Sequence, residues 1–188
     1  MQNVTLTDKQ QMMNWPPLSI RSAEQAENQL REGIQDFVAL GRPHIADPHW
    51  CNKVKDGRED EIRRCVNCLW CFESLNLNAP KGLPLECAVN PRLGREGQKP
   101  PRDGQGRVVA VIGAGPAGLT AAEILAERGF KPVVFEKGAE PGGQLRLAVS
   151  PPKKYNLTWC YTDLEHAARL KGAEIRYNTE ATVSSINE

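Results

Sequence analysis

The feature that most restricts the fold of this 188-residue chain is a run of closely spaced cysteines. Cys65, Cys68 and Cys71 lie in one short stretch and Cys87 follows later, in the pattern C-x2-C-x2-C-x15-C. Three neighbouring thiols with a distant fourth are typical of a [4Fe–4S] site. Structural zinc also takes four thiolates, but it more often uses two separate C-x2-C pairs. The pattern therefore favours an iron–sulfur cluster, with zinc as the alternative and a disulfide as a more distant one.

Composition narrows the class of protein further. The chain has 24 Lys and Arg against 23 Asp and Glu, so its formal net charge of +1 favours neither nucleic acid nor an anionic membrane as partner. No segment approaches the ~20 apolar residues that span a bilayer. The first residues also lack the basic and apolar regions of a secretory signal. Clustered cysteines without such a signal predict a cytoplasmic protein whose thiolates are held by a metal.

A second motif begins with the β-branched run 107–112, which predicts a strand. Gly113-Ala114-Gly115-Pro116-Ala117-Gly118 follows directly, and a helical pattern comes next. A G-x-G-x-x-G between strand and helix is typical of a Rossmann-like dinucleotide-binding unit. We expect Gly113 to make the tight turn, Gly115 to admit a pyrophosphate, and Gly118 to let helix and strand approach. The helix N-terminus, with Pro116 and Ala117, would attract that pyrophosphate.

The next elements extend this prediction. A strand over 132–135 ends at Glu136, which could accept a hydrogen bond from a ribose 2′-hydroxyl and would repel a 2′-phosphate. FAD, NAD or ADP is therefore favoured over NADP. The stretch 142–145 contains Gly143 and Gln144 and is expected to pass close to the same ligand. A helix over 155–171 should bury Cys160 in the core, and a strand begins at 174.

Upstream of the cysteines the sequence predicts a helix, a strand and a second helix. Ser22 and Gln25 form a capping box for a helix that ends at Gly33. The short apolar run 36–40 predicts a buried strand. Gly41 and Arg42 follow it, at the end of the strand where α/β proteins bind ligands, so Arg42 could bind a phosphate.

The second helix runs from Pro48 to Lys55 and carries Cys51, which we expect to be partly buried and not a ligand. Arg58, Arg63 and Arg64 precede the first cluster cysteine. They could offset the negative charge of a buried cluster, or they could form a solvated surface.

These patterns divide the chain into four segments. Residues 1–20 are a polar arm, 21–94 contain the strand and the cysteines, 95–106 are a Pro- and Gly-rich linker, and 107–188 form an incomplete dinucleotide-binding domain.

In their order, these motifs resemble the multi-domain flavin and iron–sulfur oxidoreductases related to 2,4-dienoyl-CoA reductase, 2-enoate reductase and trimethylamine dehydrogenase. The resemblance rests on the residues 36–43 and 45–48, the cysteine stretch, 113–118 and 142–145. It implies an α/β fold, in which the C-terminal remnant of a TIM barrel with an iron–sulfur loop precedes an incomplete Rossmann-like domain. Residues 36–40 would be the last barrel strand.

The resemblance also implies the cofactors. Gly41 and Arg42 would hold an FMN phosphate, and the four cysteines would ligate a [4Fe–4S] cluster. The glycine motif and Glu136 would bind FAD, or ADP in the amine-dehydrogenase branch. Electrons would pass from NAD(P)H through FAD, the cluster and FMN to an activated C=C bond.

The chain departs from this family in three ways. The earlier barrel strands are absent, and so are the end of the FAD domain and the whole NAD(P)H domain. Leu18 stands where the family places a small Gly pair, which argues against FMN binding by this chain alone. We therefore expect the missing barrel and C-terminal domain to be supplied in cis or by another subunit, and no turnover by the chain alone.

Two questions stay open at this stage. The two-residue gap before Cys71 resembles the amine dehydrogenases, whereas the stretch 142–145 resembles the enoate reductases. Outside catalysis, the alternatives are a zinc- and nucleotide-binding module or an inactive truncated product.

Overall fold

The computed structural model describes residues 20–34 and 36–187. Its strands are β1 (Val108–Ile112), β2 (Lys131–Phe135) and β3 (Glu174–Arg176). Its helices are α2 (Ala23–Arg31), α3 (Gly41–Ala46), α4 (Trp50–Lys55), α5 (Trp70–Asn78), α6 (Pro116–Glu127), α7 (Leu145–Ala148), α8 (Thr158–Leu170) and α9 (Val183–Asn187), with short 3₁₀ turns at Glu59–Glu61, Ala79–Lys81 and Tyr155–Leu157.

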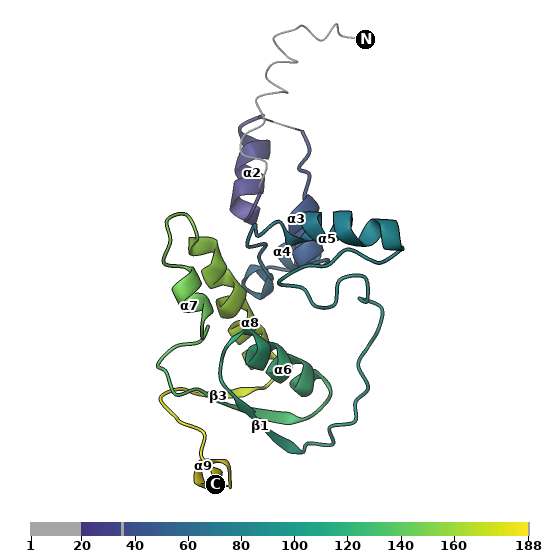
Figure 1. Cartoon of the computed structure of the whole chain (residues 1–188). Coiled ribbons are helices and arrows are strands. Elements are labelled where there is room, and N and C mark those ends of the chain that lie inside the picture. Colours follow the sequence, from purple (N-terminus) through teal and green to yellow (C-terminus); the bar gives the residue numbers. More distant parts are fainter. Residues whose placement is uncertain (1–19, 35, 188) are drawn as a thin grey trace, which may run out of the picture.

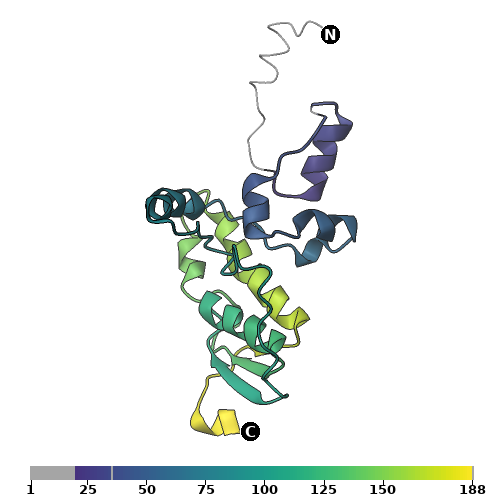
Figure 2. The same ribbon diagram turned by 90° about the vertical axis from the view of Figure 1, so that its right-hand side faces the viewer.

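Two parts are distinguished in Figure 1. We call residues 20–94 the cysteine module and residues 107–178 the dinucleotide unit. In both views, α6 and α8 lie between the sheet and the cysteine module (Figures 1 and 2).

The dinucleotide unit is a three-stranded parallel sheet in the order β1-β2-β3. Parallel strands need a crossover connection, and α6 and α8 provide the two crossovers. Both helices cover the same face of the sheet, where Leu119, Val134 and Leu164 belong to the buried core. This arrangement confirms the Rossmann-like α/β fold. The opposite face is open, with Val108 69% and Ile112 71% exposed.

The end of the predicted linker packs against the dinucleotide unit. The N–H of Gly104 donates to the carbonyl of Arg128 at 2.9 Å, and the N–H of Gly106 donates to that of Gly129 at 2.8 Å. A Cβ added to Gly104 would lie 2.3 Å from the backbone of Gly129. The chain is therefore fixed to the turn between α6 and β2 before β1 begins.

The cysteine module is built from short helices around two small apolar clusters. Ala23, Trp50 and Ile62 form one cluster, and Ala46, Val66 and Val89 form the other. The helix predicted from the capping box is present as α2, and the Ser22 hydroxyl accepts from the N–H of Gln25 at 3.1 Å. The Gln25 side chain accepts from the N–H of Arg21 at 2.9 Å, which completes the cap one residue earlier than in the usual box.

The prediction of a strand over residues 36–40 was wrong. These residues form a bend and irregular chain outside the sheet, and Phe37 is 87% exposed. A single strand leaves its own backbone groups unpaired, and burying such a group costs about 1–3 kcal/mol. The described part of the chain brings no strand beside these residues. Leu18, on which the prediction about FMN binding rests, lies outside the described residues.

The helices also bear on the membrane prediction. Among those in the described ranges, none is both long and apolar enough to cross a bilayer.

Candidate dinucleotide and cysteine sites

The glycine motif forms a tight turn between β1 and α6. Gly113 has φ +93°, in the left-handed region that favours glycine, and its N–H donates to the carbonyl of Phe135 at 2.8 Å. A Cβ added to Gly118 would lie 2.0 Å from the Gly113 carbonyl oxygen. A larger residue at position 118 would therefore push α6 away from the turn.

The N-terminus of α6 opens onto free space. Gly115 is its N-cap residue and Pro116 its first residue, and a Cβ added to Gly115 would meet no atom within 4 Å. The backbone can therefore be approached closely here. The positive end of the helix dipole and the unbonded amides of the first turn favour an anion at this position.

The stretch 142–145, which was predicted to pass close to the ligand, lies against this turn. The N–H of Gly142 donates to the carbonyl of Ala114 at 2.8 Å, and a Cβ added to Gly143 would lie 3.5 Å from the Cα of Gly115. Gln144 is exposed and directly precedes the short helix α7, to which its side chain makes no capping hydrogen bond. The two glycine-containing stretches thus form one surface at the carboxyl ends of β1 and β2.

Glu136 lies at the edge of this surface and is half-buried. Its carboxylate accepts from the N–H of Ala114 at 2.8 Å and from the N–H of Gly138 at 2.7 Å. Each carboxylate oxygen has a second lone pair, so a ribose hydroxyl could still donate to it. Glu136 therefore also holds the glycine turn in place, a role that the sequence analysis did not foresee.

The four cysteines of the predicted cluster lie on two arms, residues 65–71 and residue 87. All six cysteines of the chain are free thiols. Left-handed backbone at Asn67 (φ 56°) and Leu69 (φ 61°) turns the first arm between its successive thiols. In the described residues, no three His, Cys, Asp or Glu side chains are grouped so as to hold a single metal ion.

The thiols lie close enough to influence one another. Burial raises the pKa of Cys65, and the nearby Cys68 and Cys71 raise it further, while the N–H of Asn67 and the charge of Arg42 oppose the rise. Burial likewise raises the pKa of Cys87, against hydrogen bonds from the N–H groups of Val89 and Asn90. Backbone N–H groups thus lower the pKa of both thiols, and hydrogen bonds to sulfur are one feature that tunes iron–sulfur centres.

Ser74 ties the two arms together. It is 1% exposed, and its hydroxyl accepts from the N–H of Glu86 at 2.9 Å and lies 3.2 Å from the carbonyl oxygen of Cys71, to which it can donate. The residue before Cys87 is therefore bonded to the helix that carries Cys71. The sequence pattern did not indicate this contact, because Ser74 follows Glu73 and precedes Leu75 in a helix without a clear apolar face.

The residues predicted to hold a phosphate lie near the cysteines. Gly41 and Arg42 form the first turn of α3, and Gly41 is exposed. The charge of Arg42 acts on Cys65, where burial raises the thiol pKa and the guanidinium opposes that rise. The structure thus brings Arg42 toward the candidate cluster site, and not toward the glycine turn.

The two remaining cysteines differ in their surroundings. Cys51 was expected to be partly buried, but it is exposed, and its sulfur lies 3.4 Å from the His44 Nε2. It lies on the outer side of the short helix α4, which buries Trp50. Cys160 is half-buried and packs against both the core of the dinucleotide unit and the Ala46 cluster, and burial raises its pKa.

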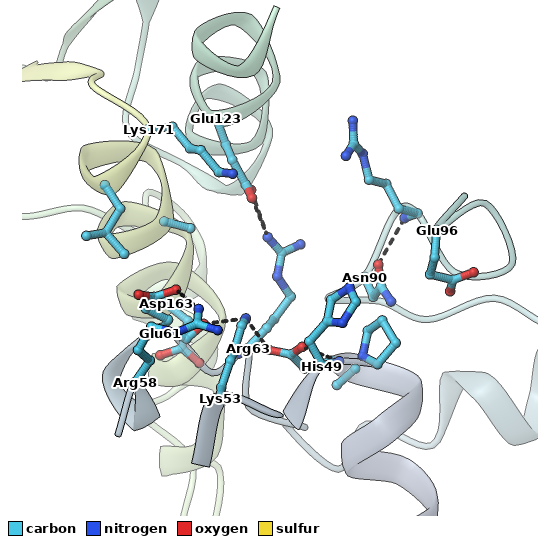
Figure 3. A pocket seen from close by; sticks show the side chains of 16 residues that line it. His49, Lys53, Arg58, Glu61, Arg63, Asn90, Glu96, Glu123, Asp163 and Lys171 are labelled. Carbon is cyan, nitrogen blue, oxygen red and sulfur yellow. Dashed lines mark hydrogen bonds and ion pairs between the residues drawn. The ribbon is translucent and has the colours of Figure 1, made fainter. Parts of the chain in front are cut away.

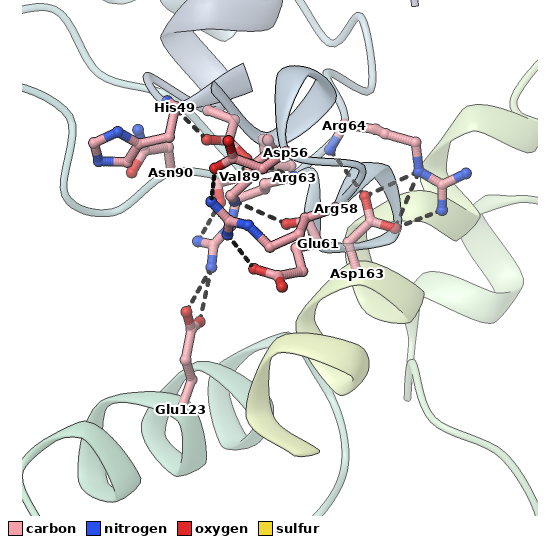
Figure 4. Close-up of polar contacts among 12 residues, drawn as sticks. His49, Asp56, Arg58, Glu61, Arg63, Arg64, Val89, Asn90, Glu123 and Asp163 are labelled. Atoms are coloured by element: carbon pink, nitrogen blue, oxygen red, sulfur yellow. Dashed lines mark hydrogen bonds and ion pairs between the residues drawn. The ribbon is translucent and has the colours of Figure 1, made fainter. Parts of the chain in front are cut away.

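The arginines before Cys65 have separate partners. Arg58 pairs with Asp56 and Glu61, both at 2.9 Å, on the surface. Arg63 and Arg64 instead cross to the dinucleotide unit, as Figure 4 shows. Arg63 binds Glu123 of α6 at 2.7 and 3.0 Å, and the Arg64 Nε binds both carboxylate oxygens of Asp163 of α8 at 3.1 Å.

A cavity of about 500 Å³ lies at the same junction (Figure 3). Both acidic and basic side chains line it, among them Lys53, Arg63, Glu123 and Asp163. Since most of these charges are already paired, the cavity has no strong preference for an anion or a cation.

Comparison with known proteins agrees with this geometry. A family model described as an NAD(P)-binding Rossmann-like domain matches residues 111–162. NADH oxidase of Thermoanaerobacter brockii is 40% identical over 174 residues, which cover 89% of this chain and 26% of that protein. Metal reductase of Desulforamulus reducens is 37% identical over 170 residues, which cover 89% of this chain and 25% of that protein.

A solved structure shows the same fold. The complex of 2-naphthoyl-CoA reductase with 2-naphthoyl-CoA matches with a TM-score of 0.77 and 33% identity, over 87% of this chain and 25% of that one. The chain thus spans about a quarter of the length of the relatives that it matches. Over most of its length it is homologous to one segment of the oxidoreductases that include NADH oxidase, metal reductase, alkene reductase/demethylase and dimethylamine dehydrogenase.

Proposed function

We propose that this chain is the electron-transfer segment of a flavin and iron–sulfur oxidoreductase, and that it connects a dinucleotide to a [4Fe–4S] cluster. Four free thiols on two tied arms are the observation that carries this proposal, and two of them, Cys65 and Cys87, pack against the same apolar cluster as Trp159 and Cys160 of α8. The cluster, when bound, would accept and pass on single electrons. Cys65, Cys68, Cys71 and Cys87 would hold it.

The residues of the chain have distinct tasks in this function. Gly113, Gly115 and Gly118 would let the pyrophosphate of FAD or ADP rest on the N-terminus of α6, and Glu136 would bind the ribose. The N–H groups of Val89 and Asn90 support the cluster by donating to Cys87. Arg42 offsets negative charge beside Cys65.

The whole protein would use NAD(P)H as electron donor and reduce an activated C=C bond. In that protein, residues before α3 would complete a TIM barrel, and Gly41 and Arg42 would contact FMN there. The barrel and the rest of the FAD domain would come from the same polypeptide or from another subunit. An amine dehydrogenase is the second candidate, because dimethylamine dehydrogenase is also a relative.

Anaerobic purification tests the cluster. We expect the wild-type chain to be brown, to bleach with dithionite, and to release about four iron and four sulfide ions per chain on acidification. Cys68→Ser should lose most of the iron, whereas Cys51→Ser, a matched change outside the site, should keep it. One zinc per chain without acid-labile sulfide would instead favour the zinc- and nucleotide-binding module.

Calorimetric titration tests the dinucleotide site separately. ADP should bind the wild-type chain, and Glu136→Ala should weaken binding by about tenfold, because it removes a charged hydrogen-bond acceptor for the ribose. Glu140→Ala changes a nearby exposed carboxylate and should leave the affinity unchanged. Equal affinities of the wild-type chain and Glu136→Ala would contradict the assigned role of Glu136.

A further inference from the structure

We infer that Arg63 is a positioning residue for the four-thiol site, which fixes the two cysteine arms to each other and both of them to helix α6. The inference rests on the proposed cluster but concerns a residue that is not a ligand. It follows from the position of Arg63 in the network of Figure 4.

Arg63 makes contacts in three directions. Its backbone N–H donates to Asp47 at 2.9 Å, within the cysteine module. Its Nη1 donates to the carbonyl of Val89 at 2.9 Å, and its Nη2 donates to Glu123 of α6. The Arg63 and Glu123 side chains are each 18% exposed, so solvent screens this ion pair only in part.

These contacts reach both arms of the candidate cluster site. Arg63 lies two residues before Cys65, and Val89 lies two residues after Cys87. The carbonyl of Val89 accepts from Arg63, so the main chain just after Cys87 is tied to the main chain just before Cys65. Arg63 therefore holds the backbone that supports the fourth thiol at a fixed position relative to the first.

Asp47 holds the main chain of Arg63 within the cysteine module. Its carboxylate is buried and accepts from the N–H of His49 at 3.0 Å and from Lys53 Nζ at 2.6 Å, besides the N–H of Arg63. The main chain of Arg63 is anchored in this way, and its side chain extends from this fixed point to the guanidinium end. That end holds the dinucleotide unit.

The neighbouring arginines do not share this role. Arg64 binds Asp163 and lies 4.9 Å over the Trp159 ring, so it ties only the first arm to α8. Arg58 pairs within its own segment. A lysine at position 63 would keep the charge, but it lacks the planar fork that reaches Val89 and Glu123 together.

The test uses the full chain, reconstituted with iron and sulfide, and compares Arg63→Lys with Arg58→Lys. Changes in residues that orient metal ligands typically weaken metal sites by 10–100-fold, so Arg63→Lys should lose its cluster to a chelator about tenfold faster than the wild type. The electron paramagnetic resonance spectrum of its reduced cluster should also change, because the support of Cys87 shifts. Arg58→Lys should match the wild type in both measurements.

A second pair of variants covers the case in which Arg63→Lys does not fold. Glu123→Ala removes the link to α6, and Glu165→Ala removes a glutamate that pairs with Arg169 within α8. Glu123→Ala should release the cluster several-fold faster than Glu165→Ala. Release at the wild-type rate from Glu123→Ala, and from Arg63→Lys where it folds, would overturn the inference. A wild-type chain that takes up no cluster would instead refute the proposed function.

Discussion

The dinucleotide unit and the cysteine module are stabilised in different ways. The dinucleotide unit has one core of eight buried apolar residues between the sheet and two helices. The cysteine module has two clusters of only three buried residues each, and it also buries the polar side chains of Asp47, Ser74 and Asn90. Burial of apolar surface therefore dominates in the first region, while the second depends more on polar anchors and on its thiols.

Removal of the cluster should produce the largest difference in stability between the two regions. Metal sites of this kind couple binding to folding, so chelation should unfold the cysteine module and leave the dinucleotide unit folded. Hydrogen exchange followed by mass spectrometry should show amides of residues 60–94 exchanging at least about tenfold faster, with little change in β1, β2 and α6. Equal acceleration in both regions would show that they unfold as one unit.

A change in the glycine turn should instead destabilise the dinucleotide unit more than the cysteine module. Gly118→Ala places a Cβ 2.0 Å from the Gly113 carbonyl oxygen, so α6 must shift. We expect a loss of about 3 kcal/mol in the stability of the dinucleotide unit, measured by urea unfolding. Gly115→Ala, whose Cβ would meet open space, should lower the midpoint much less, by no more than the loss of a glycine N-cap. Identical midpoints for Gly118→Ala and the wild type would contradict the close packing.

Asp47 should make the cysteine module sensitive to acid. Burial alone would raise the pKa of Asp47, but hydrogen bonds from Lys53 and from the N–H groups of Arg63 and His49 outweigh it and lower the pKa below 3.8. A lowered folded-state pKa adds stability above the unfolded pKa, and this stability is lost as pH falls through the folded pKa. Asp47→Asn should therefore cost about 2–4 kcal/mol at pH 7.

Thermal unfolding between pH 3 and pH 7 measures that effect. The difference between wild type and Asp47→Asn should shrink as the pH falls below about 4. Asp56→Asn, an exposed carboxylate of the same module, should differ little from the wild type at any pH. A difference for Asp47→Asn that does not depend on pH would show that its carboxylate is not the cause.

The smallest expected effect is a difference in alkylation rate between the two cysteines outside the predicted cluster. Burial raises the pKa of Cys160, so less thiolate is present there at pH 8 than at an ordinary thiol. Cys51 is exposed, and His44 lies beside it. Iodoacetamide should alkylate Cys51 roughly fivefold faster than Cys160, as measured on the corresponding peptides by mass spectrometry. Equal rates would contradict the difference in burial.

The sequence predicted those features that short stretches encode. The G-x-G-x-x-G motif specified its own turn, because the positive φ of Gly113 and the missing Cβ of Gly118 are local requirements. The capping box of α2 was likewise visible. The strand over 36–40 failed because a strand needs partners elsewhere in the chain.

The contacts between the two regions could not be predicted either. Arg63 and Glu123 are 60 residues apart, and nothing in either segment indicates that the other will lie opposite it. The sequence left open whether Arg63 and Arg64 faced a cluster or solvent, and the structure shows a third arrangement. Such pairs form only when the two folded regions pack together, and the shapes of both regions determine which residues meet.

The position of Cys160 has a consequence for charge movement. This side chain contacts both the sheet core and the apolar cluster beneath Cys65 and Cys87. Under the proposed function, packed side chains that include Cys160, and not bulk water, would fill the space between the core of the dinucleotide unit and the cluster that the four cysteines would hold.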